Sequence, residues 1–184
     1  MSGMPELPDD VEATLVRKRR SDEPERKSEA ERLVDRLMSL GWTIGIAESL
    51  TGGLLVSALI DVPGASSVVR GGVVAYATDV KHTLLGVEAT LLRSHGAVHP
   101  RVARQMAEGV RSALAREGVR CDVGLSTTGI AGPDSPDGQP VGTVHIGVST
   151  PLGNRVEAVS LSGSRNEIRA EAARWAIRVA LGAL

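Results

Sequence analysis

The sequence is poor in aromatic residues and cysteine, and each shortage excludes a class of protein. Its 184 residues include no phenylalanine, one tyrosine, two tryptophans and one cysteine, Cys121. A single cysteine excludes an intrachain disulfide and any metal site built from several thiolates. Cys121 begins an apolar run, so we expect a buried thiol with no chemical role.

Neither charge nor hydrophobicity is concentrated in one part of the sequence. The formal net charge is -1 and the basic residues are scattered, which argues against a nucleic-acid or anionic-membrane partner. No apolar run approaches the roughly 20 residues that span a bilayer, and the acidic, proline-containing N-terminus does not resemble a targeting segment. We therefore expect a cytoplasmic protein that acts on a small molecule.

Lysine is also scarce. The 21 basic residues include only three lysines, and Lys18 and Lys27 lie in the polar N-terminal stretch. Lys81 is therefore the only lysine expected in the folded part. A lysine can lose its proton and act as a base, whereas an arginine cannot. Lys81 is a candidate base, and a solvated surface lysine is the alternative.

The pattern of apolar residues predicts one α/β domain. Residues 1–28 form a polar leader that we expect to be disordered or loosely attached, and residues 29–184 form the domain. Because strands alternate with helices except at one hairpin, we expect a three-layer α/β/α fold with a mixed, mainly parallel sheet. The predicted strands cover residues 42–47, 68–76, 122–127, 143–150 and 155–161. The predicted helices cover residues 33–38, 54–60, 79–85, 99–117 and 165–183.

The turn from Glu48 to Gly53 connects a predicted strand to a predicted helix. Main-chain N–H groups at such a turn lack partners, and glycines allow a ligand to approach them, so the turn can hold an anion or an oxyanion beside Ser49. Ser49 is thus a candidate nucleophile, with Thr51, Gly52 and Gly53 as neighbours. The alternative is that Ser49 or Thr51 merely caps the helix.

Tyr76 and Lys81 lie five residues apart, across the turn from a strand into a short helix. A serine hydroxyl needs a base to become a nucleophile, and Lys81 is able to serve as that base. Tyr76 is able to pass a proton between Lys81 and Ser49, or to anchor a core that has few aromatic residues.

A third group of polar residues begins where the strand at 122–127 ends. Thr128 and Gly129 open a glycine-rich loop, and the carboxyl ends of strands are where open α/β sheets bind ligands. For Asp134 to Gly138 an ordinary surface turn is an equally good interpretation.

No cofactor or metal is expected. His82, His95, His99 and His145 match no metal-ligand spacing, and neither a P-loop nor a dinucleotide fingerprint is present. His145 alternates with apolar residues in a predicted strand.

Taken together, these motifs resemble the CinA C-terminal domain family over roughly residues 30–184. The resemblance is carried by Glu48 to Gly53, Asp61 to Gly64, Gly71 to Tyr76 with Lys81 and Gly86, Thr128 to Pro133, and Pro140 to Thr143. It implies deamidation of nicotinamide mononucleotide to nicotinate mononucleotide and ammonia. It also implies homo-oligomers, dimeric or larger.

The resemblance assigns a role to each candidate residue. It implies that Ser49 is the acylated nucleophile, Lys81 its base, and Tyr76 a proton relay or an orienting hydroxyl. The main chain of Thr51, Gly52 and Gly53 would hold the oxyanion. Arg165 at the start of the last helix is the candidate phosphate ligand, and the pyridine ring is expected against Thr128, Gly129 and the loop that follows.

The sequence departs from the family pattern in two places. Asp134, Ser135, Pro136 and Asp137 stand where the family loop is often glycine-rich, which adds negative charge near the expected phosphate site. Many members also carry a larger N-terminal domain with nucleotide pyrophosphatase activity, which we expect to be absent here. The competing hypothesis is a non-catalytic nucleotide- or partner-binding module of a competence or DNA-damage response. The joint presence of Ser49, Tyr76 and Lys81 favours the enzyme.

Overall fold

The computed structural model describes residues 27–135 and 138–184. The predicted leader therefore lies outside the described residues, apart from its last two positions, and so do Pro136 and Asp137. Ser28, the last residue of the predicted leader, caps helix α1 (Glu29–Leu40). Lys27 is an exposed lysine paired with Asp35.

The described residues form a single five-stranded sheet in the order β2-β1-β3-β4-β5. The central strands β1 (Ile44–Glu48) and β3 (Val123–Gly129) are parallel to each other, and β2 (Val69–Val74) is parallel to β1. Strand β4 (Thr143–Thr150) is antiparallel to both of its neighbours, β3 and β5 (Gly153–Ser160). Only β4 runs against the other strands of this sheet, so the prediction of a mixed, mainly parallel sheet is confirmed.

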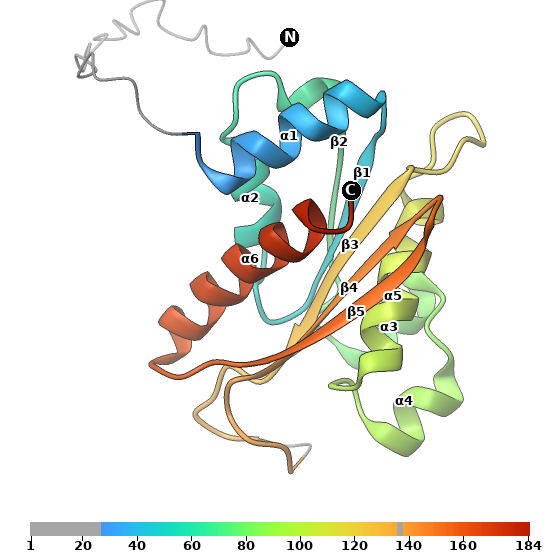
Figure 1. Cartoon of the computed structure of the whole chain (residues 1–184). Coiled ribbons are helices and arrows are strands. Elements are labelled where there is room, and N and C mark those ends of the chain that lie inside the picture. The colour runs from blue at the N-terminus through green and yellow to red at the C-terminus, as the bar shows by residue number, and fades with distance from the viewer. Residues whose placement is uncertain (1–26, 136–137) are drawn as a thin grey trace, which may run out of the picture.

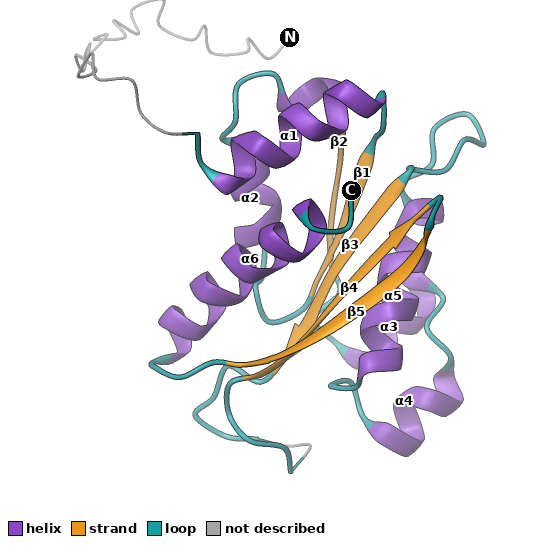
Figure 2. Cartoon of the chain, viewed as in Figure 1, coloured by secondary structure: helices purple, strands orange, loops and turns teal. Residues whose placement is uncertain are grey.

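Helices cover both faces of the sheet, as Figures 1 and 2 show. One face carries α1, α2 (Leu54–Ile60) and α6 (Arg165–Leu181). The other carries α3 (Thr78–Leu85), α4 (Ala89–His95) and α5 (Pro100–Ala113). The predicted three-layer α/β/α architecture is confirmed. Helix α4 and the 3-10 helix η1 (Ala65–Ser67) were not predicted, because α4 buries only the adjacent Leu91 and Leu92 and η1 is a single short turn.

The sheet divides the hydrophobic core into two parts. Ile44 and Ile46 of β1 pack toward α1, α2 and α6, whereas Ala47 packs toward α3, α4 and α5. The α5 side of the sheet is lined with small residues. A Cβ atom added at Gly124 would lie 1.9 Å from the carbonyl oxygen of Ala107, and one at Gly147 would lie 2.4 Å from that of Ala103. Helix α5 therefore lies directly against the backbone of the sheet.

Three predicted boundaries are wrong. Strand β3 continues to Gly129, because Thr128 pairs with His145 and Gly129 with Val144 of β4. Strand β2 ends at Val74, two residues before Tyr76. Helix α5 ends at Ala113 rather than near residue 117. Pairing with a distant strand decides the first of these, and a local pattern does not contain that information.

Cys121 is a buried free thiol, as predicted, and burial raises its pKa. Within the part of the chain that the structure describes, no helix has the length and apolar character needed to cross a bilayer.

Candidate active site

The candidate residues converge at the carboxyl ends of the parallel strands. Ser49 directly follows β1, Tyr76 lies just beyond β2, and Gly129 ends β3. Helix α3 brings Lys81 to the same place, and the first turn of α6 brings Arg165. The edge of the sheet therefore gathers residues that are up to 116 positions apart in sequence (49 to 165).

Ser49 and Lys81 form a buried pair. The Lys81 side-chain nitrogen Nζ lies 3.1 Å from Ser49 Oγ, and the two residues are 1% and 8% exposed, respectively. Nζ also donates to the carbonyl oxygens of Ala75 at 2.7 Å and Tyr76 at 3.3 Å. The carbonyl groups of the turn after β2 thus hold the amine beside Ser49. The interpretation of Lys81 as a solvated surface lysine is wrong, because the residue is buried.

The turn formed by residues 49–53, hereafter the Ser49 turn, is held from inside by Glu48. This carboxylate is fully buried and accepts hydrogen bonds from the main-chain N–H groups of Gly53, Leu55 and Val56 at 2.8–3.2 Å. It therefore occupies the N-terminus of α2, where the sequence predicts a position able to bind an anion. Neither Ser49 nor Thr51 caps this helix through its side chain.

The same turn is held from the α6 side by Arg169. Its guanidinium donates to the carbonyl oxygens of Leu50 at 2.9 Å and Thr51 at 3.1 Å. The Thr51 hydroxyl bonds to the hydroxyl of Thr127 at 2.8 Å. Hydrogen bonds from the Ser49 turn and the start of α2 to Glu48, and from Arg169 to the turn, therefore hold it on both sides.

Tyr76 and Arg165 meet at the mouth of the site. Tyr76 is 63% exposed, so it does not anchor the core. Its phenol oxygen accepts a hydrogen bond from Arg165 at 3.1 Å, and Arg165 also donates to the carbonyl oxygen of Gly132. Because Lys81 contacts Ser49 directly, a proton can pass between them without Tyr76.

A pocket of about 250 Å³ connects these residues. It is lined by Ser49, Tyr76, Thr78, Lys81, Ala97, Val98, Thr128, Gly129, Ile130, Ala131, Gly132, Asp134 and Arg165. Six of the nine predicted site residues line it, whereas Thr51, Gly52 and Gly53 do not. The Thr128 hydroxyl donates to the carbonyl oxygen of Ala97 and so ties β3 to the segment before α5.

Sequence reasoning missed Arg169 and the pocket wall formed by Thr78, Ala97 and Val98. Arg169 lies one helical turn after Arg165 on the same face of α6, so its i+4 spacing was an available signal. Ala97 and Val98 carry no chemical signal, and only the fold brings them to the pocket.

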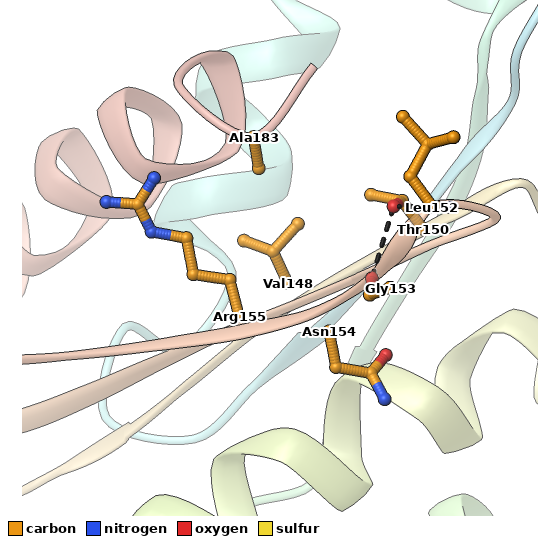
Figure 3. A pocket seen from close by; sticks show the side chains of 7 residues that line it. All are labelled: Val148, Thr150, Leu152, Gly153, Asn154, Arg155 and Ala183. Carbon is orange, nitrogen blue, oxygen red and sulfur yellow. Dashed lines mark hydrogen bonds between the residues drawn. The ribbon is translucent and has the colours of Figure 1, made fainter.

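A second pocket, of about 190 Å³, lies at the opposite end of the sheet, beside the β4–β5 hairpin (Figure 3). It is lined by Val148, Thr150, Leu152, Gly153, Asn154, Arg155 and Ala183. The Thr150 hydroxyl there donates to the carbonyl oxygen of Gly153, within the hairpin itself. This pocket holds no hydroxyl paired with a base. Among the residues described, no group of three or more His, Cys, Asp or Glu side chains is arranged to hold a metal ion.

Comparison with known proteins agrees with this architecture. Residues 26–184 match the family described as the CinA C-terminal domain. A CinA-like protein of Frankia casuarinae is 51% identical over 127 residues, which are 69% of this chain and 28% of that protein.

Two solved structures have the same fold. A competence/damage-inducible protein from Agrobacterium tumefaciens is 33% identical, with a TM-score of 0.74 over 87% of this chain and 99% of its own. A CinA superfamily protein from Escherichia coli is 30% identical, with a TM-score of 0.78 over 85% and 88% of the two chains.

The fold and the family match define the class: this is an α/β domain of the CinA type. The chain belongs to the CinA C-terminal domain family. It spans about a third of the length of the curated relatives it matches.

Proposed function

We propose that this domain is an amidohydrolase that deamidates nicotinamide mononucleotide, with Ser49 as nucleophile and Lys81 as base. The observation that carries the proposal is the 3.1 Å contact between Lys81 Nζ and Ser49 Oγ, two buried residues that line the 250 Å³ pocket. A serine and an amine within hydrogen-bond reach are the minimum that serine acylation requires.

The environment of Lys81 suits the role of a base. In its neutral form the amine has two N–H groups and one lone pair. The N–H groups can donate to the carbonyl oxygens of Ala75 and Tyr76, which leaves the lone pair for the proton of Ser49. Arginine at this position would keep its proton and could not perform this step.

The reaction then follows in two steps. Ser49 Oγ attacks the carboxamide carbon while Lys81 takes its proton, and the tetrahedral oxyanion is stabilised by main-chain N–H donors beside Ser49. Lys81 returns the proton to the leaving nitrogen, so that ammonia departs and an acyl-Ser49 ester remains. Water then attacks this ester while Lys81 takes its proton, and Lys81 passes that proton to Ser49 Oγ as nicotinate mononucleotide leaves.

The rest of the pocket supports a nucleotide of this kind. Arg165 lies at the mouth and, although it bonds to Gly132 and Tyr76, retains N–H groups able to bind a phosphate. The apolar wall of Val98, Ile130 and Ala131 is suited to a pyridine ring. We propose that Tyr76 orients Arg165 rather than relaying a proton.

The test is ammonia release from nicotinamide mononucleotide by the purified chain, compared with Ser49→Ala, Lys81→Arg and Lys81→Met. We expect each variant to lose at least about 10³-fold in kcat, because the nucleophile and its base act as a unit. Circular dichroism and thermal unfolding show whether each variant is folded. Lys81→Met keeps the length of the side chain, so it guards against a steric effect of arginine.

Two results would contradict the proposal. Turnover by Lys81→Met at the wild-type rate would remove Lys81 from the mechanism. A wild-type chain that binds the nucleotide and releases no ammonia under varied conditions would favour the competing hypothesis of a nucleotide-binding module.

A further inference from the structure

We infer that Arg169 is a positioning residue that holds the Ser49 turn so that the N–H groups of Leu50 and Thr51 form the oxyanion hole. The inference rests on the proposed function in that it assumes acyl transfer to Ser49. It differs from the sequence-based expectation, in which Thr51, Gly52 and Gly53 supply the donors.

The assignment follows from the hydrogen-bond partners of each main-chain N–H group near Ser49. Ser49 donates to Thr127 O, Gly52 to Ser49 O, and Leu54 to Thr51 O. Gly53, Leu55 and Val56 donate to the Glu48 carboxylate. Within the described structure, only the N–H groups of Leu50 and Thr51 have no acceptor in residues 49–56.

The two residues that carry these N–H groups are buried. Leu50 is 3% exposed and Thr51 is fully buried. Buried main-chain N–H groups without an acceptor are rare, because each one costs free energy in the folded state. Two such donors directly after the nucleophile are available to an oxyanion that forms during acyl transfer to Ser49.

Arg169 explains how the turn keeps this orientation. Its guanidinium draws the carbonyl oxygens of Leu50 and Thr51 toward α6. The carbonyl and N–H groups of a trans peptide point in opposite directions. The Thr51 N–H, which shares a peptide unit with the Leu50 carbonyl, therefore points away from the Arg169 guanidinium.

A glycine in the turn is consistent with this role. A Cβ atom at Gly52 would lie 3.1 Å from Nη2 of Arg169, and the φ of Gly52 is +57°. The positive φ favours glycine at this position, and the absence of a side chain leaves room for the Arg169 guanidinium. Gly52 is thus explained by Arg169 rather than by a ligand.

The experiment compares Arg169→Met and Arg169→Lys with a matched control, Arg174→Met, an exposed arginine of the same helix. Two rates are measured: ammonia release from nicotinamide mononucleotide, and phosphonylation of Ser49 by a fluorophosphonate. In the second reaction Ser49 Oγ bonds to phosphorus, fluoride leaves, the Ser49 proton passes to Lys81, and mass spectrometry detects the product. This probe needs the oxyanion hole and requires no knowledge of the substrate.

For Arg169→Met we expect both rates to fall by about 10- to 100-fold, because a small displacement of an oxyanion donor is costly. KM should change by less than about 3-fold, because the ground state does not use the oxyanion hole. Added guanidinium ion should restore part of the rate, Arg169→Lys should fall in between, and Arg174→Met should match the wild type.

Two outcomes would overturn the inference. One is an Arg169→Met variant that reacts with the fluorophosphonate at the wild-type rate. The other is a variant whose kcat and nucleotide affinity fall together without guanidinium rescue, which would indicate a purely structural arginine. If the wild type reacts with the probe but not with the nucleotide, the proposed substrate is wrong, and the probe rates of the variants still decide the role of Arg169.

Discussion

At the scale of single residues, His145 shows how burial changes a titration. It lies on β4 and is 8% exposed, and its Nδ1 has no hydrogen-bond partner among the described residues. Burial, and to a smaller extent the positive charge of His99, lowers the pKa of His145 below its ordinary value of 6.5. The unfolded chain therefore binds more protons than the folded chain as the pH falls below 6.5. The stability that the neutral side chain contributes is complete above that pH and is lost as the pH falls toward the folded pKa.

This predicts a weaker acid sensitivity for His145→Leu. Between about pH 7.5 and pH 5.5 its melting temperature should fall less than that of the wild type, because one of the groups that must charge is gone. Thermal unfolding followed by circular dichroism measures the effect. His95→Gln, at an exposed histidine, is the control, and equal slopes for His145→Leu and the wild type would refute the prediction.

Lys81 shows how far a single residue can be interpreted from sequence. Lysine is scarce in this sequence and arginine is common, which made Lys81 a candidate base. The structure places its amine beside Ser49. Tyr76 was marked by the same reasoning, yet its hydroxyl bonds to Arg165 at the pocket mouth. Composition identifies unusual side chains, and it carries no information on their direction.

At the scale of elements, the contact between α5 and the sheet depends on glycine. A Cβ at Gly124 would overlap the main chain of Ala107 at 1.9 Å, and backbone cannot move aside without shifting the whole helix. Gly45 also faces α5, but its nearest neighbour is the side-chain atom Cδ1 of Leu114 at 3.2 Å. The two glycines therefore form a natural comparison.

We predict that Gly124→Ala lowers the free energy of unfolding by about 1–3 kcal/mol or more, as overpacking does in a tight core. Gly45→Ala should cost less than about 1 kcal/mol, because the Leu114 side chain can change rotamer. Urea denaturation of both variants measures the difference. Equal losses would show that α5 adapts to an added methyl group as easily as a side chain does.

The ends of elements were predicted less well than their presence. Ser164 and Glu167 have the three-residue spacing of a capping box, and this box is present at the start of α6. The last two residues of β3 were assigned to a loop, because their partners in β4 are 15 or more positions away (Gly129 to Val144). Helix caps can be predicted from neighbouring residues, whereas the end of a strand depends on pairing with distant residues.

At the scale of the whole molecule, the site joins parts of both faces of the sheet. Lys81 comes from the α3 face, Arg165 and Arg169 come from α6, and the pocket lies where these layers meet. A ligand in this pocket would contact both layers, so its binding energy should oppose unfolding of the entire domain.

This predicts that nicotinamide mononucleotide raises the melting temperature of Ser49→Ala, which binds without turnover. At about 100 times the Kd the gain is about 2.7 kcal/mol, which corresponds to roughly 5–10 °C for a domain of this size. Differential scanning fluorimetry measures the shift, with Arg165→Met as the variant expected to reduce it. The absence of any shift would contradict the proposed substrate and also a module that binds this nucleotide.

The sequence by itself determined the fold class and singled out Ser49 and Lys81 as candidate residues. These features are local, because they depend on periodicity, caps and unusual residue types. Only the tertiary structure decided which main-chain N–H groups remain without an acceptor, that Glu48 occupies the start of α2, and that Arg169 holds the Ser49 turn. Each of these depends on which hydrogen-bond partner a polar group finds in the folded chain. Arg169, for example, bonds to the carbonyl oxygen of Leu50, more than 100 positions away.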